Sequence, residues 1–184
     1  MTKQAKILTD AQIKAALATV TDPSDRIMIV LSVKAGLRAC EIAALTWPMV
    51  TDAEGQIGDV IALPDVATKG KTGGRQIPMH PDIAGELAKA TERDGFVVRN
   101  SWGQRSNGKA VAQRFWRLYR SLGLQGASSH SGRRTFITRL AHKITAAGGS
   151  IRDVQQLAGH ASLRMTQEYI EGNSEAKRRV VGMI

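Results

Sequence analysis

The sequence predicts a mixed α+β fold that is mainly helical, with a small antiparallel sheet at one edge. Capped, helix-like patterning dominates both ends of the chain, whereas residues 52–79 alternate turn-forming stretches with short strands. No internal repeat, low-complexity tract or Pro/Ser-rich linker divides the 184 residues, a length that suits one well-cored domain. We therefore expect a single globular unit over 1–184.

The first two helices are marked by their caps. Thr9 and Gln12 have the spacing of a capping box ahead of an apolar, helix-periodic stretch. Asp22 precedes a proline and begins a second helix, whose apolar positions run to Val33. Gly36 is placed to end that helix.

The middle of the chain predicts the sheet. A short helix is expected over 39–45, followed by a strand over 57–63, a tight basic turn over 69–74 and a returning strand over 75–79. These strands form either a hairpin or a three-stranded sheet. Helical patterning resumes over 82–90.

The carboxyl-terminal half is expected to be helical over 107–122, 131–147, 150–158, 162–170 and 174–181. The apolar face of the first of these helices is expected to comprise Phe115, Trp116, Leu118 and Tyr119.

Charge and hydropathy limit the possible partners. A formal net charge of +10 and a pI near 10.3 favour a polyanion, DNA or RNA, because each phosphate neutralised by Lys or Arg releases condensed counterions. The apolar run over 27–33 is too short to cross a bilayer, and the first twelve residues do not resemble a signal peptide. We expect a cytoplasmic protein with no membrane partner.

Cys40 is the sole cysteine, which excludes an internal disulfide and a cysteine metal cluster. We expect it to be a small buried hydrophobe. The acidic residues of 52–65 show no spacing typical of a two-metal nuclease site.

Two pairs of side chains in the first 133 residues fit an anionic ligand. His130 and Arg133 are three residues apart at a predicted helix start, where backbone N–H groups also favour a phosphate. A capping histidine and a solvated arginine would explain this pair equally well. Arg38 precedes Glu41 by three residues, so the carboxylate can orient the guanidinium fork toward two phosphate oxygens. A surface ion pair is the alternative for this second pair.

A third feature lies near the carboxyl end. His160 follows Gly159 at a predicted turn, and Tyr169 lies nine residues later on the next helix. We expect the turn to bring the imidazole near the amino end of that helix. A helix, a glycine-containing turn and a second helix also describe a helix-turn-helix DNA reader, and this segment alone does not separate the two interpretations.

Four segments together resemble the sequence boxes of the tyrosine recombinase, or phage integrase, family. They occur in the family's order and with matching internal spacing, and the resemblance extends from Leu8 to the end of the chain. The segments are AGLRACEIAAL over 35–45, HSGRRTF over 130–136, LAGH over 157–160 and TQEYI over 166–170.

The resemblance implies a set of catalytic roles. The residues implied to bind the scissile phosphate are Arg38, His130, Arg133 and His160. Tyr169 is implied to attack that phosphate and form a 3′-phosphotyrosine, with His130 as its proton acceptor and Glu41 as a supporting residue. A free tyrosine has a pKa of about 10 and a histidine one of about 6.5, so a neutral histidine is a reasonable base. No metal or other cofactor is expected.

The family takes the leaving-group proton from a lysine in a β-hairpin turn. Two lysines, Lys69 and Lys71, flank the matching position here, as though one residue had been inserted. We favour Lys69 as the general acid and keep Lys71 as the alternative. Either lysine could instead contact the DNA backbone.

The resemblance further implies partners and an origin. It corresponds to the family's catalytic domain, without a separate amino-terminal core-binding domain. Double-stranded DNA is the implied substrate, with a homotetramer assembled through the last helix and an accessory DNA-bending protein as further partners. We expect a bacterial or phage-encoded protein associated with the nucleoid.

Two other functions remain open at this point. One is a non-catalytic helix-turn-helix regulator or recombination accessory factor, and the other is an activity like that of a type IB topoisomerase, which uses the same chemistry.

Overall fold

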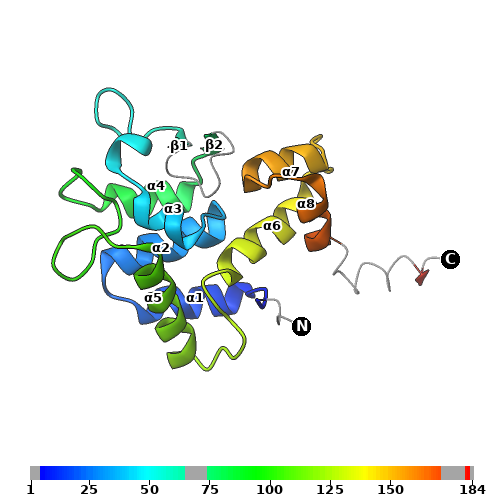
Figure 1. Cartoon of the computed structure of the whole chain (residues 1–184), viewed down its shortest axis with the longest axis horizontal. Helices are drawn as coiled ribbons and strands as arrows, with labels where there is room; N and C mark the ends of the chain where they lie inside the picture. The colour runs from blue at the N-terminus through cyan, green and yellow to red at the C-terminus, as the bar shows by residue number, and fades with distance from the viewer. Residues whose placement is uncertain (1–4, 65–73, 171–180, 183–184) are drawn as a thin grey trace. The chain divides into compact units, whose positions relative to one another are not determined.

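A computed structural model describes residues 5–64, 74–170 and 181–182 (Figure 1). The contacts within the chain divide it into two compact units, residues 1–136 and 137–184. In the described ranges, the first unit holds these elements: α1 (Asp10–Thr19), α2 (Pro23–Lys34), α3 (Ala39–Ala44), the 3₁₀ turn η1 (Trp47–Met49), β1 (Val60–Leu63), β2 (Arg75–Pro78), α4 (Pro81–Ala88) and α5 (Gly108–Ser121). Helix α6 (Ser131–Lys143) begins in the first unit and ends in the second, which also holds α7 (Ile151–Ala158) and α8 (Leu163–Ile170).

Helix α2 forms the centre of the first unit. Every residue from Ile27 to Val33 is buried, as expected for a stretch of helix that is apolar except for Ser32. It packs against α1, α3 and α4, and its amino end is capped by the side chain of Asp22, which accepts from the Ser24 amide. The predicted cap therefore starts the helix around which this unit is built.

The predicted capping box at the start of α1 is confirmed. The Gln12 amide donates to Thr9 Oγ1 at 3.2 Å, and the Thr9 amide donates to Gln12 Oε1 at 3.0 Å. Each bond satisfies an N–H group that a helix start leaves without an intrahelical partner.

Strands β1 and β2 form an antiparallel pair, the sheet of the described residues. Ile61 pairs with Ile77, and both side chains are buried, whereas Val60 and Pro78 at the outer end of the ladder are exposed. The basic turn predicted over 69–74 lies almost entirely outside the described residues, as does most of the helix predicted over 174–181.

Helix α5 packs on α3 through one face, and one prediction for that face is wrong. Phe115, Leu118 and Tyr119 are buried, but Trp116 is 50% exposed. At about 100° per residue, Leu118 and Tyr119 lie about 60° and 40° to either side of Phe115, whereas Trp116 lies about 100° away and falls outside that face. The guanidinium of Arg120 instead lies 5.0 Å from the centroid of the Trp116 ring.

The prediction of a buried Cys40 is also wrong, because this residue is exposed. It is the second residue of the short helix α3, whose buried residues are Glu41, Ile42 and Ala43. The buried residues of α3 therefore begin at the position directly after Cys40.

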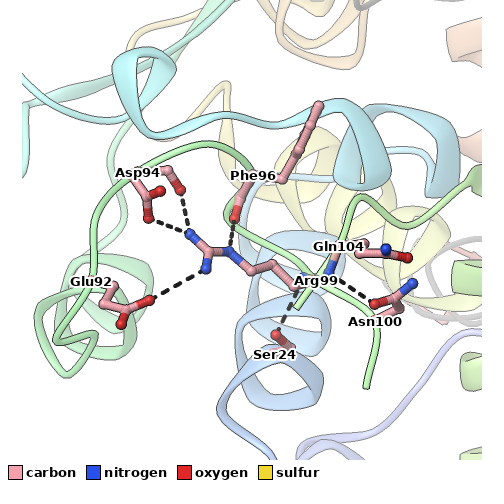
Figure 2. A network of polar contacts seen from close by, with 7 residues as sticks. All are labelled: Ser24, Glu92, Asp94, Phe96, Arg99, Asn100 and Gln104. Carbon is pink, nitrogen blue, oxygen red and sulfur yellow. Dashed lines mark hydrogen bonds and ion pairs between the residues drawn. The ribbon is translucent and has the colours of Figure 1, made fainter. Parts of the chain in front are cut away.

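The segment between α4 and α5 is organised around Arg99 (Figure 2). Its guanidinium donates to the carbonyl of Phe96 and pairs with Asp94 at 2.6 Å and with Glu92 at 3.5 Å. Arg114 of α5 donates to the Arg99 carbonyl and pairs with Asp25 of α2 at 2.7 Å. These two arginines thus join the segment to the core of the first unit.

Candidate active site

Arg38 and Glu41 form the ion pair that their spacing predicts. Arg38 is the residue before α3, and Glu41 is the third residue of that helix. Arg38 Nη1 lies 2.7 Å from Glu41 Oε1, and the Arg38 amide donates to Glu41 Oε2 at 2.7 Å. The carboxylate therefore holds both the backbone and the side chain of Arg38.

This ion pair is not a surface pair, because the side chain of Glu41 is completely buried. A second arginine, Arg75 at the start of β2, also binds the carboxylate through Nη1 at 3.0 Å and Nη2 at 2.9 Å. Burial alone raises the pKa of Glu41, but the hydrogen bonds and charges of Arg75 and Arg38 outweigh burial and place the pKa below its ordinary value. Glu41 is thus ionised at neutral pH.

Arg133 is bound to the turn that precedes Arg38. Its side chain is buried, and Nη1 donates to the carbonyl oxygen of Gly36 at 2.6 Å. The alternative of a solvated arginine is therefore excluded. Arg133 and Arg38 are both held by the segment 36–41, the first through Gly36 and the second through Glu41.

Glycine is required at position 36 for two reasons. Its φ of +64° lies in the left-handed region, which side chains with a Cβ rarely adopt. A Cβ there would also collide with the ring of Phe136, three residues after Arg133. The glycine thus lets α6 approach the turn that carries Arg38.

His130 differs from Arg133 in its surroundings. It is exposed in the residue before α6, and its backbone amide donates to Ser128 Oγ at 3.3 Å. Its ring nitrogen Nδ1 lies 3.5 Å from Ser129 Oγ. The imidazole is therefore accessible at the amino end of the helix that holds Arg133.

His160 and Tyr169 lie against each other in the second unit. Gly159 ends α7 in the left-handed conformation, and His160 follows it. The rings of His160 and Tyr169 are stacked, with centroids 5.4 Å apart and an angle of 28° between their planes. His160 Nδ1 lies 2.9 Å from the hydroxyl oxygen of buried Thr166. The imidazole thus lies beside the middle and carboxyl part of α8, farther along that helix than the sequence predicted.

The chain's two tyrosines have opposite environments. Tyr169 is partly exposed, whereas Tyr119 is 1% exposed and its hydroxyl has no hydrogen-bond partner among the described residues. Burial raises the pKa of Tyr119, which opposes formation of a phenolate. Tyr119 is therefore a packing residue, as predicted.

The remaining parts of the predicted site are described separately. Lys69 and Lys71 lie outside the described residues. Arg38, His130 and Arg133 belong to the first unit, and His160 and Tyr169 belong to the second, so each set is described by itself.

Arg75 and Thr166 were not singled out from the sequence. Arg75 was visible as the basic first residue of a strand, but its partner Glu41 is 34 residues away. Thr166 stands three residues before Tyr169, a spacing that places both on one side of a helix. That spacing could have identified Thr166 as a neighbour of the site.

In the part of the chain that the structure describes, no helix is long and apolar enough to cross a membrane.

Curated relatives are similar to this chain in sequence, at low identity. The tyrosine recombinase XerA of Thermococcus kodakarensis is 26% identical over an alignment 186 residues long, which covers 95% of this chain and 61% of the relative. The tyrosine recombinase XerC of Herpetosiphon aurantiacus is 27% identical, with 89% of this chain and 55% of the relative covered. The chain thus spans less than two thirds of the length of these relatives.

Solved structures share its fold. A crystal structure of XerA recombinase matches with a TM-score of 0.71 at 21% identity, covering 97% of this chain and 65% of that one. The Tn1549 transposon integrase in complex with transposon right end DNA matches with a TM-score of 0.70, also at 21% identity and with the same coverage of both chains. A λ integrase dimer bound to a core site matches with a TM-score of 0.69 at 18% identity, covering 95% of this chain and 51% of that one.

The predicted fold class is confirmed by these structures. The phage integrase family itself matches residues 6–176, nearly the whole chain. This protein therefore belongs to the phage integrase family, the family of the tyrosine recombinases.

Proposed function

We propose that this chain is the catalytic domain of a site-specific DNA recombinase of the integrase or invertase type. In this proposal Tyr169 attacks a DNA phosphodiester, forms a 3′-phosphotyrosine and releases a 5′ hydroxyl. A 5′ hydroxyl from another strand then attacks the phosphotyrosine and restores a phosphodiester. Bond energy is retained in the covalent intermediate, so rejoining requires no nucleotide hydrolysis.

The observation that carries the proposal is the contrast between the two tyrosines. Tyr169 is partly exposed and its ring stacks on that of His160, whereas the Tyr119 hydroxyl is enclosed in an environment that raises its pKa. A nucleophile must reach a large substrate and give up its proton, and the enclosed Tyr119 hydroxyl suits neither requirement, which supports Tyr169 as the nucleophile.

The arginines of the first unit support phosphate binding. Arg38 is held by a buried, ionised carboxylate, and Arg133 is held by a backbone carbonyl. A guanidinium fixed in this way has lost its rotational freedom before the substrate arrives, so it can stabilise the charge that develops on the non-bridging oxygens.

The remaining roles complete the proton transfers. We assign His130 as the base that accepts the Tyr169 proton, and His160 as a hydrogen-bond donor to the phosphate. Lys69 is the proposed general acid for the leaving 5′ oxygen, with Lys71 as the alternative.

Double-stranded DNA is the proposed substrate. The net charge of +10 supports a polyanionic partner, and the Tn1549 and λ integrases that share the fold were solved with DNA. We further propose assembly into a tetramer on DNA through the carboxyl-terminal helix, with an accessory DNA-bending protein as a partner. A cytoplasmic, nucleoid-associated location follows from this substrate.

The experiment traps the covalent intermediate. Nicked duplexes tiled across the DNA that flanks the chain's own gene are incubated with the protein, because the loss of a short nicked fragment prevents rejoining. We expect a protein–DNA band that survives denaturation and is lost in Tyr169→Phe. Tyr119→Phe is the matched control and should retain the band.

Each alternative function predicts a different result. A non-catalytic DNA-binding regulator would shift the same duplexes in a gel without forming a covalent band. A topoisomerase-like enzyme would relax supercoiled plasmids regardless of their sequence. The absence of a covalent band with folded, DNA-binding protein would reject the proposed catalysis.

A further inference from the structure

We propose that Arg75 is a positioning residue for Arg38 and acts on it through Glu41. This inference rests on the proposed function, because it concerns how the phosphate-binding arginine is held. Arg75 lies outside the set of residues that the sequence boxes assign.

The geometry is that of a carboxylate shared by two arginines. Glu41 Oε1 accepts from Arg38 Nη1 at 2.7 Å and from Arg75 Nη1 at 3.0 Å. Glu41 Oε2 accepts from the Arg38 amide at 2.7 Å and from Arg75 Nη2 at 2.9 Å. Each oxygen therefore has one bond to each arginine, and the bidentate fork of Arg75 fixes the plane of the carboxylate.

Burial explains why this fork matters. The side chain of Glu41 is completely buried and that of Arg75 is 9% exposed, so water does little to stabilise either charge. Removing one partner of a buried pair leaves the other charge poorly compensated. Without Arg75, we expect the pKa of Glu41 to rise and its carboxylate to lose the orientation that holds Arg38.

The net charge of the cluster is a second reason why Arg75 matters for Arg38. Arg38 and Glu41 by themselves sum to zero, whereas the three side chains of Arg38, Glu41 and Arg75 carry one net positive charge. A carboxylate shared with Arg75 attracts the guanidinium of Arg38 while cancelling less of its positive potential. Arg38 is thereby both oriented and left attractive to a phosphate.

Arg75 also connects two elements. It is the first residue of β2 and pairs with Leu63 in the ladder, while Glu41 belongs to α3. The described contacts thus join the sheet to the helix start that carries Arg38. Among the described contacts, Glu41 is the side chain that bonds both Arg75 of β2 and Arg38, so a change in β2 can reach Arg38 through it.

The test compares Arg75→Gln and Arg75→Lys in the full chain with the nicked-duplex cleavage assay. We expect Arg75→Gln to slow covalent-complex formation by roughly 10- to 100-fold at saturating DNA, the range for loss of a well-aimed electrostatic contact. Arg75→Lys should recover only part of the rate, because an ammonium cannot reproduce the bidentate fork.

Two readouts separate positioning from a merely structural role. In Arg75→Gln the raised pKa of Glu41 should make cleavage recover as the pH increases, beyond any change in the unmodified protein. In a double-mutant cycle, Arg75→Gln should have little further effect on a Glu41→Gln background, because Arg75 acts through that carboxylate.

The matched control is Arg26→Gln. Arg26 forms a similar bidentate pair with Glu86 in the first unit, through Nε at 3.1 Å and Nη2 at 2.8 Å, but it has no role in the proposed site. It should lose thermal stability and keep its cleavage rate. All rates are measured at a temperature where thermal unfolding shows each variant to be folded.

The outcomes distinguish this inference from the proposed function. If the unmodified protein forms the covalent complex and folded Arg75→Gln does so at the same rate, or if the two substitutions are additive with an unchanged pH profile, the positioning role is rejected. If the unmodified protein itself forms no covalent complex, the proposed function fails instead.

Discussion

Arg133 and Gly36 are 97 residues apart in sequence and are joined by a hydrogen bond of 2.6 Å from Nη1 to the carbonyl oxygen. The bond fixes the buried guanidinium of Arg133 against Gly36, which precedes Arg38 by two residues in the sequence. Because the acceptor is a backbone atom, the substitution that breaks the bond must be made at Arg133.

Arg133→Lys should therefore lose activity although it retains the charge. A lysine cannot present the planar fork that both binds a backbone carbonyl and faces a second ligand. We expect cleavage of nicked duplexes to fall by roughly 10²- to 10³-fold, the range for loss of a preorganised donor at a reacting centre.

Arg134→Lys is the matched control for that substitution. Arg134 is the next residue of α6, and its Nη1 also donates to a backbone carbonyl, that of Ala5, at 2.8 Å. It should keep its cleavage rate within about twofold, since it has no role in the proposed site and surface-proximal substitutions usually have small effects. Equal losses in the two variants would attribute both to folding.

Gly36→Ala tests the turn that both arginines share. The φ of +64° and the contact with Phe136 predict a loss of roughly 2–4 kcal/mol in the free energy of unfolding, from backbone strain and overpacking together. Urea denaturation measures this change.

Gly55→Ala separates the two causes. Gly55 has a φ of +77°, but a Cβ there would have no heavy atom within 4 Å. It should show only the backbone strain, on the order of 1 kcal/mol. If both variants lose the same amount, the contact with Phe136 contributes nothing.

Local structure could be predicted from the sequence because its causes are local. The capping box of Thr9 and Gln12, the Asp22 cap of α2 and the Gly159 end of α7 each involve residues at most five positions apart. The pairing of Arg38 with Glu41 was predicted for the same reason, since one helical turn separates them.

Long-range contacts could not be predicted in this way. Arg75 reaches Glu41 across 34 residues and Arg133 reaches Gly36 across 97, and no sequence spacing marks either pair. Cys40 is exposed although Gly108 at the start of α5 lies against it, so its hydrophobicity alone gave the wrong result. Tertiary packing thus decided these features.

The ion pair of Arg26 and Glu86 predicts a loss of stability in acid. Hydrogen bonds from Arg26 lower the pKa of Glu86 to about 2, against the opposing effect of burial. An unfolded glutamate has a pKa of about 4.3, so the stabilisation is fully present above about pH 5 and is lost as the pH falls toward 2. Glu86→Gln should lower the free energy of unfolding by roughly 1–3 kcal/mol at pH 7 and flatten its decline in acid.

Urea titrations between pH 7 and 3 measure that difference. Glu54→Gln, at an exposed turn, is the control and should follow the unmodified protein. A constant gap between Glu86→Gln and the unmodified protein over this range would contradict the assignment of the gap to an ionised Glu86.

Thr166 is predicted to set the protonation pattern of His160. The Thr166 hydroxyl and His160 Nδ1 are 2.9 Å apart and both side chains are buried, so a hydroxyl that donates to Nδ1 leaves the proton on Nε2 for the phosphate. Thr166→Val should slow cleavage by roughly tenfold, about one net hydrogen bond, while Thr166→Ser retains it. Nitrogen NMR of the imidazole reports the tautomer directly.

Thr138→Val is the control, because the buried Thr138 hydroxyl has no partner among the described residues and its removal should leave cleavage unchanged. An unchanged tautomer in Thr166→Val would show that another contact holds the His160 ring.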